Sequence, residues 1–234
     1  EQAQRQALAL PPITMGYFSR TIKGLPDKAS GPDAVSAQLL RTAPPQALGP
    51  LLQLIHEMES TAQLPTQLQM HMVVMLPKNA AKERPITLTS LLYRVWCRLR
   101  KPLLDAWQQH LPPAMNHDRA RPGATVLYVA LERLLRQEVH RANGCHGVTC
   151  LMDMSTFYDT MIDYSKRPSS WATHRCFWSW AMQLYTGPKA ISAEQEFTPF
   201  FRVDQGIPAG CPQAPLLAKA VLAPALIPWK QEHD

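Results

Sequence analysis

An aspartate at the end of an apolar run is the first residue of this chain that could do chemistry. Asp153 lies near the end of residues 147–154, which are predicted to form a central strand. A carboxylate there is costly unless a cation or hydrogen-bond donors meet it. Magnesium prefers oxygen ligands, usually one or two carboxylates together with substrate phosphates. Asp153 is therefore a candidate magnesium ligand, and the alternative is an aspartate that caps a following helix.

A pair of cations flanks a predicted turn. Lys78 and Arg84 lie on either side of residues 79–83, between a predicted buried strand at 71–76 and a weaker strand at 85–89. A hairpin there would present both cations at its tip. Arginine offers phosphate a two-pronged donor and lysine a point charge. The pair is a candidate phosphate site, and the alternative is an ordinary solvated hairpin.

A third segment places two glycines and two prolines just before a predicted helix. It runs Gln205-Gly-Ile-Pro-Ala-Gly-Cys-Pro212. Glycines let a backbone approach a ligand closely, and the N-terminus of a helix favours an anion. The segment is a candidate anion-binding loop, and the alternative is a plain turn.

Together these segments resemble the motifs of reverse transcriptases, most closely those of non-LTR retrotransposons. Five segments occur in the order of that family and cover roughly residues 20–226. They are the entry segment Lys28-Ala-Ser-Gly-Pro-Asp33, the fingers segment Leu76-Pro-Lys78 with Arg84-Pro-Ile86, the Arg121-Pro-Gly123 turn, a motif A-like stretch from Cys150 to Asp159 and a motif B-like stretch from Gln205 to Pro215.

The resemblance implies an RNA-directed DNA polymerase that uses an RNA template, a DNA primer, deoxynucleoside triphosphates and Mg²⁺. Asp153 is expected to bind the catalytic magnesium ions, assisted by the backbone carbonyl of Met154. Tyr158 aligns with the aromatic gate that excludes a ribose 2′-hydroxyl. The implied reaction is two-metal phosphoryl transfer, in which one ion activates the primer 3′-oxygen and the other stabilises the leaving pyrophosphate.

The resemblance also implies the residues that hold the incoming nucleotide. Lys78 and Arg84 are expected to neutralise the triphosphate. Gln205 and Gly206 are expected to line the nucleotide pocket.

The chain departs from the family pattern in several places. Unusual residues stand at Phe157, Ala209, Gln213 and Ala214, and at Asn116-His117-Asp118. The Ala-Asp-Asp motif is absent, since the sequence ends at Asp234 and holds no Asp-Asp pair. We therefore expect a fragment that does not polymerise alone. The alternatives are a degenerate nucleic-acid-binding remnant and a relative of group II intron maturases.

The positive charge is concentrated in the middle of the chain. The net charge of the 234 residues is +6, and residues 78–141 carry twelve Lys or Arg against five Asp or Glu. A localised basic field is typical of proteins that bind a polyanion, and the alternative is a solvated helix face. The charged stretch includes Lys78 and Arg84, so it coincides with the expected triphosphate contacts.

Composition narrows the class of protein further. Hydrophobic residues make up 46% of the chain, which excludes a disordered or collagen-like polypeptide. Five cysteines, an odd number, argue against a disulfide scaffold and favour a reduced, intracellular setting. Cys145, His146 and Cys150 are predicted to be small buried thiols and a loop histidine rather than zinc ligands. A tryptophan cluster at Trp171, Trp178 and Trp180 is predicted to belong to the core rather than to a base-stacking platform. No apolar run approaches the length of a membrane span, so the chain is predicted to be soluble.

The elements that must position these residues alternate between helices and short strands. Helices are predicted over 34–41 with Asp33 as its cap, 46–60, 90–109 with a kink or break at Pro102, 124–142, 170–185 and 213–223. Further strands are predicted over 189–192 and 197–203. The expected fold class is α+β, helix-rich with a small, mostly antiparallel sheet. The implied organisation is an N-terminal extension at 1–24, polymerase fingers at 25–146 and a partial palm at 147–234.

Overall fold

The computed structural model of the chain describes residues 10–79, 82–109, 125–146, 175–193, 196–203, 206–219 and 222. The chain divides into two compact units. The larger unit comprises Glu1–Lys101 and Tyr158–Ala214, and the smaller unit comprises Pro102–Phe157 and Pro215–Asp234. All four strands of the described sheet belong to the larger unit.

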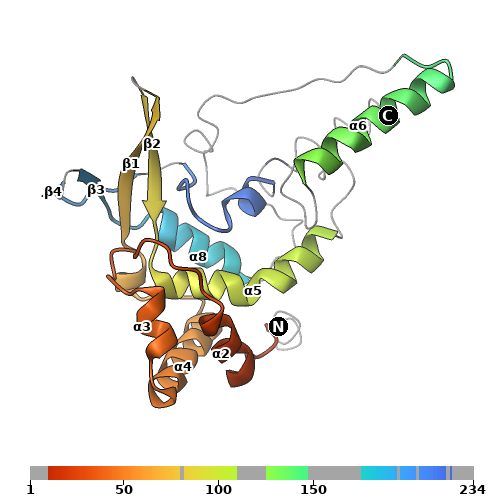
Figure 1. Cartoon of the computed structure of the whole chain (residues 1–234). Coiled ribbons are helices and arrows are strands. Elements are labelled where there is room, and N and C mark those ends of the chain that lie inside the picture. Colours follow the sequence, from red (N-terminus) through yellow and green to blue (C-terminus); the bar gives the residue numbers. More distant parts are fainter. Residues whose placement is uncertain are drawn as a thin grey trace. The chain divides into compact units, whose positions relative to one another are not determined.

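The sheet is mixed, with strand order β2-β1-β3-β4 (Figure 1). Strands β1 (His71–Asn79) and β2 (Lys82–Leu88) form an antiparallel hairpin. Strand β3 (Lys189–Ala193) runs parallel to β1, and β4 (Glu196–Phe197) is antiparallel to β3. Helices and this sheet together confirm the predicted α+β class. Two of these three pairings are antiparallel, as expected for a mostly antiparallel sheet.

Helices of the larger unit supply most of its described core. They are α2 (Met15–Lys23), α3 (Ala37–Thr42), α4 (Pro45–Thr61), the single-turn η1 (Thr66–Leu68), the first part of α5 (Leu91–Gln109) and α8 (Arg175–Tyr185). The predicted helix at 46–60 is confirmed by α4, which buries Leu52, Ile55 and Met58 along one face. The rings of Trp96 and Trp180 lie 4.0 Å apart between their centroids, and both are fully buried. Trp180 is therefore a core residue, as predicted.

The hairpin extends further than its sequence indicated. Pro77 was expected to end the first strand, but β1 continues through it to Asn79. Proline lacks an N–H for the ladder, and the register shifts between Pro77 and Asn79, leaving Lys78 in a bulge. Asn79 pairs with Lys82, so the strands occupy most of the predicted turn at 79–83.

Helix α5 confirms the predicted helix at 90–109, but it does not end at Pro102. The element runs continuously from Leu91 to Gln109 with Pro102 inside it. Proline removes one backbone hydrogen bond from a helix interior. The boundary between the two units falls directly before Pro102. The proline therefore marks a division between units rather than a helix end.

The predicted role of Asp33 is wrong in one respect. Ser36 caps α3, which begins at Ala37 rather than Ala34, and the Ser36 hydroxyl accepts a hydrogen bond from the N–H of Leu39. The carboxylate of Asp33 instead accepts from the N–H of Leu91 at 2.8 Å. Leu91 is the first residue of α5, so Asp33 caps a helix that is distant in sequence.

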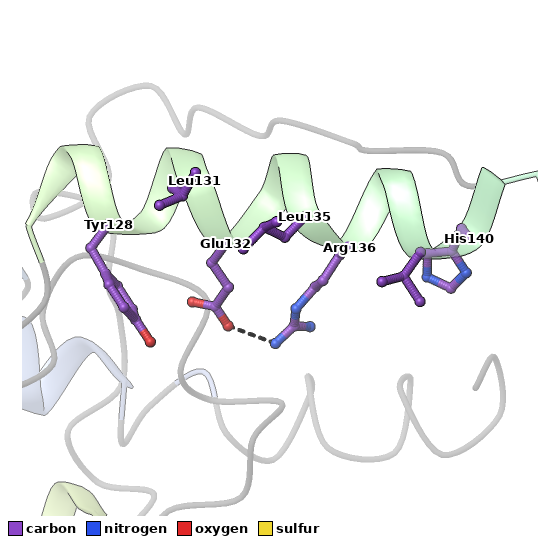
Figure 2. Close-up of a pocket in the computed structure, with 7 residues that line it drawn as sticks. Tyr128, Leu131, Glu132, Leu135, Arg136 and His140 are labelled. Atoms are coloured by element: carbon purple, nitrogen blue, oxygen red, sulfur yellow. Dashed lines mark hydrogen bonds and ion pairs between the residues drawn. The ribbon is translucent and has the colours of Figure 1, made fainter. Parts of the chain in front are cut away.

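The described part of the smaller unit contains α6 (Val126–Ala142), which confirms the predicted helix at 124–142. Thr125 caps it, and the Arg136 guanidinium donates to the Glu132 carboxylate at 2.7 Å (Figure 2). Its apolar spacing predicts a face that packs in a core and includes Leu127 and Leu134, but these side chains are 77% and 58% exposed. Helical periodicity determines which residues share a face, but not whether another element covers that face.

A buried histidine at the start of β1 makes stability depend on pH. His71 Nε2 donates to the Leu184 carbonyl oxygen, while Nδ1 has no hydrogen-bond partner in the described structure. The pKa of His71 is lowered from 6.5 to about 4, chiefly by burial and to a smaller extent by Lys189, while the hydrogen bond to Leu184 acts in the opposite direction. The unfolded chain therefore takes up a proton first as the pH falls. The contribution of neutral His71 to the free energy of unfolding is present above pH 6.5, and it is lost progressively as the pH falls from 6.5 to about 4.

We expect His71 to contribute roughly 2 kcal/mol to the loss of stability between about pH 7 and about pH 4.5. The His71→Gln variant keeps an N–H donor but cannot titrate in this range, so it should lose less stability over the same interval. Urea unfolding at both pH values measures the difference. Equal losses of stability in the two proteins would show that His71 is not the source of this pH dependence.

Candidate functional site

The loop of residues 206–212, here called the glycine loop, needs its glycines. Gly206 and Gly210 have φ angles of +91° and +107°, which side chains rarely tolerate. A Cβ on Gly210 would also lie 2.6 Å from the carbonyl oxygen of Thr87. Both conformation and space therefore require glycine at 210, and the loop backbone packs directly on β2.

A backbone hydrogen bond joins the glycine loop to β2. The N–H of Thr87 donates to the Ala209 carbonyl oxygen at 2.6 Å. In the described sheet β2 has β1 on one side only, and the glycine loop covers part of its other edge. Two of the segments singled out from the sequence, although far apart along the chain, therefore meet in the larger unit.

Arg84 lies on the face of the hairpin that meets the glycine loop. In the β1–β2 register, Arg84 pairs with Leu76 and Ile86 pairs with Val74, so both side chains occupy the same face. The Ile86 side chain lies 3.4 Å from the position that a Gly210 Cβ would take. Arg84 therefore lies on the same face as Ile86, two residues before the point where β2 approaches the loop, and it is exposed.

Three cations lie at the exposed end of the hairpin. Lys78 occupies the bulge, and Lys82 and Arg84 follow on β2 with Glu83 as the one acid between them. All four residues are exposed. Figure 1 shows this end of the hairpin projecting from the rest of the sheet. The arrangement offers positive charge and hydrogen-bond donors to an anion from solvent.

The structure describes only part of the site predicted from sequence. It places Lys78, Arg84 and Gly206 in the larger unit, on the hairpin and in the glycine loop. Asp153, Met154, Tyr158 and Gln205 lie outside the described residues. Within the described ranges, His, Cys, Asp and Glu do not gather in a group of three or more that could hold a metal ion.

Four buried side chains beneath the glycine loop were not anticipated from the sequence. The hydroxyl of Tyr93 lies 3.4 Å from Cys211 Sγ and 3.5 Å from Gln213 Oε1, and the Tyr185 hydroxyl donates to Cys211 Sγ at 3.3 Å. Burial raises the pKa of Cys211 and of Tyr93, so both groups are neutral near pH 7. Helical spacing could at most place Tyr93 and Tyr185 on the buried sides of their helices, and it could not predict that they meet at Cys211.

A pocket lies along α6 in the smaller unit. Its lining includes Tyr128, Leu131, Leu135 and Val139 with Glu132, Arg136 and His140 (Figure 2). Among the described residues that are expected to bind nucleotide, Lys78, Arg84 and Gly206 do not line this pocket. Across the described parts of the chain, no helix is both long enough and apolar enough to cross a membrane.

Comparison with protein-family models and with curated proteins finds no match for this chain.

Proposed function

We propose that this chain carries the fingers and part of the palm of a nucleotidyltransferase of the reverse-transcriptase type. In this proposal it binds deoxynucleoside triphosphates and a template–primer nucleic acid. The observation that carries the proposal is the packing of the glycine loop on β2. The Thr87–Ala209 hydrogen bond and the close approach of Gly210 join the Arg84-Pro-Ile86 strand to the Gly-Ile-Pro-Ala-Gly loop.

This arrangement suits a triphosphate. Arg84 supplies a two-pronged cationic donor, and Lys78 supplies a second positive charge on the same hairpin. Gly210 is exposed and has no side chain, so a ligand can approach the loop backbone closely at this position. Phosphoryl transfer depends mainly on such positioning and charge stabilisation. Magnesium belongs to the proposal through Asp153 and Met154 alone, which lie outside the described residues.

Triphosphate binding tests the proposal. The purified chain is expected to bind a deoxynucleoside triphosphate in the presence of Mg²⁺, measured by isothermal titration calorimetry. Arg84→Ala should weaken binding by about tenfold or more, because a hydrogen bond to a charged group contributes about 1.5–3 kcal/mol. Lys78→Ala should weaken it in the same direction.

Lys23→Ala provides the matched control. Lys23 is an exposed cation on α2, outside the hairpin and the glycine loop. Its removal changes the net charge by the same amount and should leave the affinity nearly unchanged. An equal loss in Lys23→Ala and Arg84→Ala would show general charge attraction, and no binding by the unsubstituted chain would refute the proposal.

A second candidate is nucleic-acid binding without nucleotide addition. The exposed cations Lys78, Lys82 and Arg84 favour it, since they can contact a phosphate backbone of any sequence. Binding of this kind weakens steeply with salt, by roughly 0.9 log units per neutralised phosphate for each decade of salt on duplex DNA. Salt-dependent RNA or DNA binding together with no triphosphate binding would favour this candidate.

A further inference from the structure

Hydrogen bonds hold the glycine loop at two positions, Ala209 and Cys211. At Ala209 the carbonyl oxygen accepts the N–H of Thr87. Two residues later, Cys211 Sγ lies 3.4 Å from the Tyr93 hydroxyl and accepts a hydrogen bond from the Tyr185 hydroxyl at 3.3 Å. Gly210, with its left-handed backbone, stands between these two attachments. The loop therefore cannot shift along β2 without breaking one of them.

The tyrosine attachment is made in the interior of the larger unit. Tyr93 comes from α5 and Tyr185 from α8, and their exposed fractions are 0% and 1%. Cys211 and Gln213 are also buried. A phenol hydroxyl in such a place is costly without a partner. The thiol and the Gln213 amide oxygen supply partners, so the position of the loop and the satisfaction of the hydroxyls depend on each other.

We propose that Tyr93 and Tyr185 are positioning residues, which hold the glycine loop in the shape that receives the phosphates of a nucleoside triphosphate. The part that concerns the ligand rests on the proposed function. Backbone donors bind an anion well only while they are held in place, because ordering them on binding costs affinity. Loss of the hydroxyls should therefore make the loop more mobile and lower the affinity for the triphosphate, although no group that contacts the triphosphate is removed.

The experiment compares Tyr93→Phe, Tyr185→Phe and the double variant with Tyr17→Phe. Tyr17, on α2, is a matched control. Its hydroxyl also donates a hydrogen bond, to the Leu99 carbonyl oxygen at 3.2 Å, but this bond does not involve the glycine loop. Hydrogen exchange of the loop amides is the first readout, and the Kd for a deoxynucleoside triphosphate with Mg²⁺ is the second. Each Tyr-to-Phe change beneath the loop should raise the Kd by about fivefold and accelerate loop exchange, while Tyr17→Phe should do neither.

A pair of changes at Cys211 separates positioning from general packing. Cys211→Ser keeps a group that can hydrogen-bond to both hydroxyls, whereas Cys211→Val has similar bulk but no such group. Valine should reproduce the fast loop exchange of the double tyrosine variant, and serine should retain slow exchange.

Unchanged loop exchange in the double variant would overturn the inference. Acceleration spread equally over α2, α4 and the loop would also overturn it, because that is the behaviour of a purely structural contact. Absence of triphosphate binding by the unsubstituted chain would refute the proposed function and the ligand part of the inference. In that case, the exchange rates would still decide whether the tyrosines hold the loop.

Discussion

Replacement of Arg100 by methionine is expected to lower the free energy of unfolding by about 3–5 kcal/mol. Arg100 Nε and Nη2 donate to the Glu59 carboxylate at 2.6 and 2.5 Å, and Nη1 donates to the Pro11 carbonyl oxygen. The Glu59 and Arg100 side chains are only 9% and 4% exposed. Without its partner, the Glu59 carboxylate remains buried, and among the described residues the Trp96 indole is left as its donor. Guanidinium chloride unfolding measures the loss.

The cost should come from the stranded charge rather than from a missing attraction. The double variant Glu59→Leu/Arg100→Met removes both charges and should therefore recover much of the stability that either single change loses. Asp27→Asn is the matched control, because it removes a carboxylate from the exposed Arg41–Asp27 pair. That change should cost no more than about 1 kcal/mol. A double variant no more stable than Arg100→Met would contradict this explanation.

The second large effect is expected for Gly31→Ala, at about 3 kcal/mol. A Cβ on Gly31 would overlap the Thr89 carbonyl oxygen, 2.7 Å from the carbonyl carbon and 3.0 Å from Ser90 Cα. These are backbone atoms, so no side chain can turn aside to make room. The overlap would push residues 31–33 away from the start of α5 and weaken the hydrogen bond from Leu91 to Asp33. Thermal or denaturant unfolding gives the loss of stability.

Gly49→Ala serves as the comparison for Gly31→Ala. Gly49 lies inside α4, and a Cβ there would meet nothing within 4 Å. Alanine is the better helix former, so this change should raise stability by about 0.5–1 kcal/mol. Destabilisation of similar size by both substitutions would show that the close contact at Thr89 is not the cause.

Local patterns in the sequence were sufficient for most elements. The apolar spacing of Leu52, Ile55 and Met58 predicted α4, and the apolar run from His71 predicted β1. The same reasoning misplaced ends and partners. Pro77 is accommodated inside β1 by a bulge, and Asp33 caps α5 rather than the helix that follows it in the chain. Bulges and distant caps depend on a partner segment, which local spacing does not specify.

For the candidate site too, some features could be predicted from the sequence and others depended on the tertiary structure. The residue types and order of Lys78, Arg84 and the Gly206–Gly210 segment pointed to phosphate chemistry from the sequence alone. The tertiary structure decided that the glycine loop lies against β2, that Arg84 shares the face near Ile86, and that Tyr93 and Tyr185 meet at Cys211. Helix and strand periods report which side of an element is apolar. Only the folded chain brings a given backbone N–H, carbonyl or hydroxyl from distant segments within hydrogen-bonding distance.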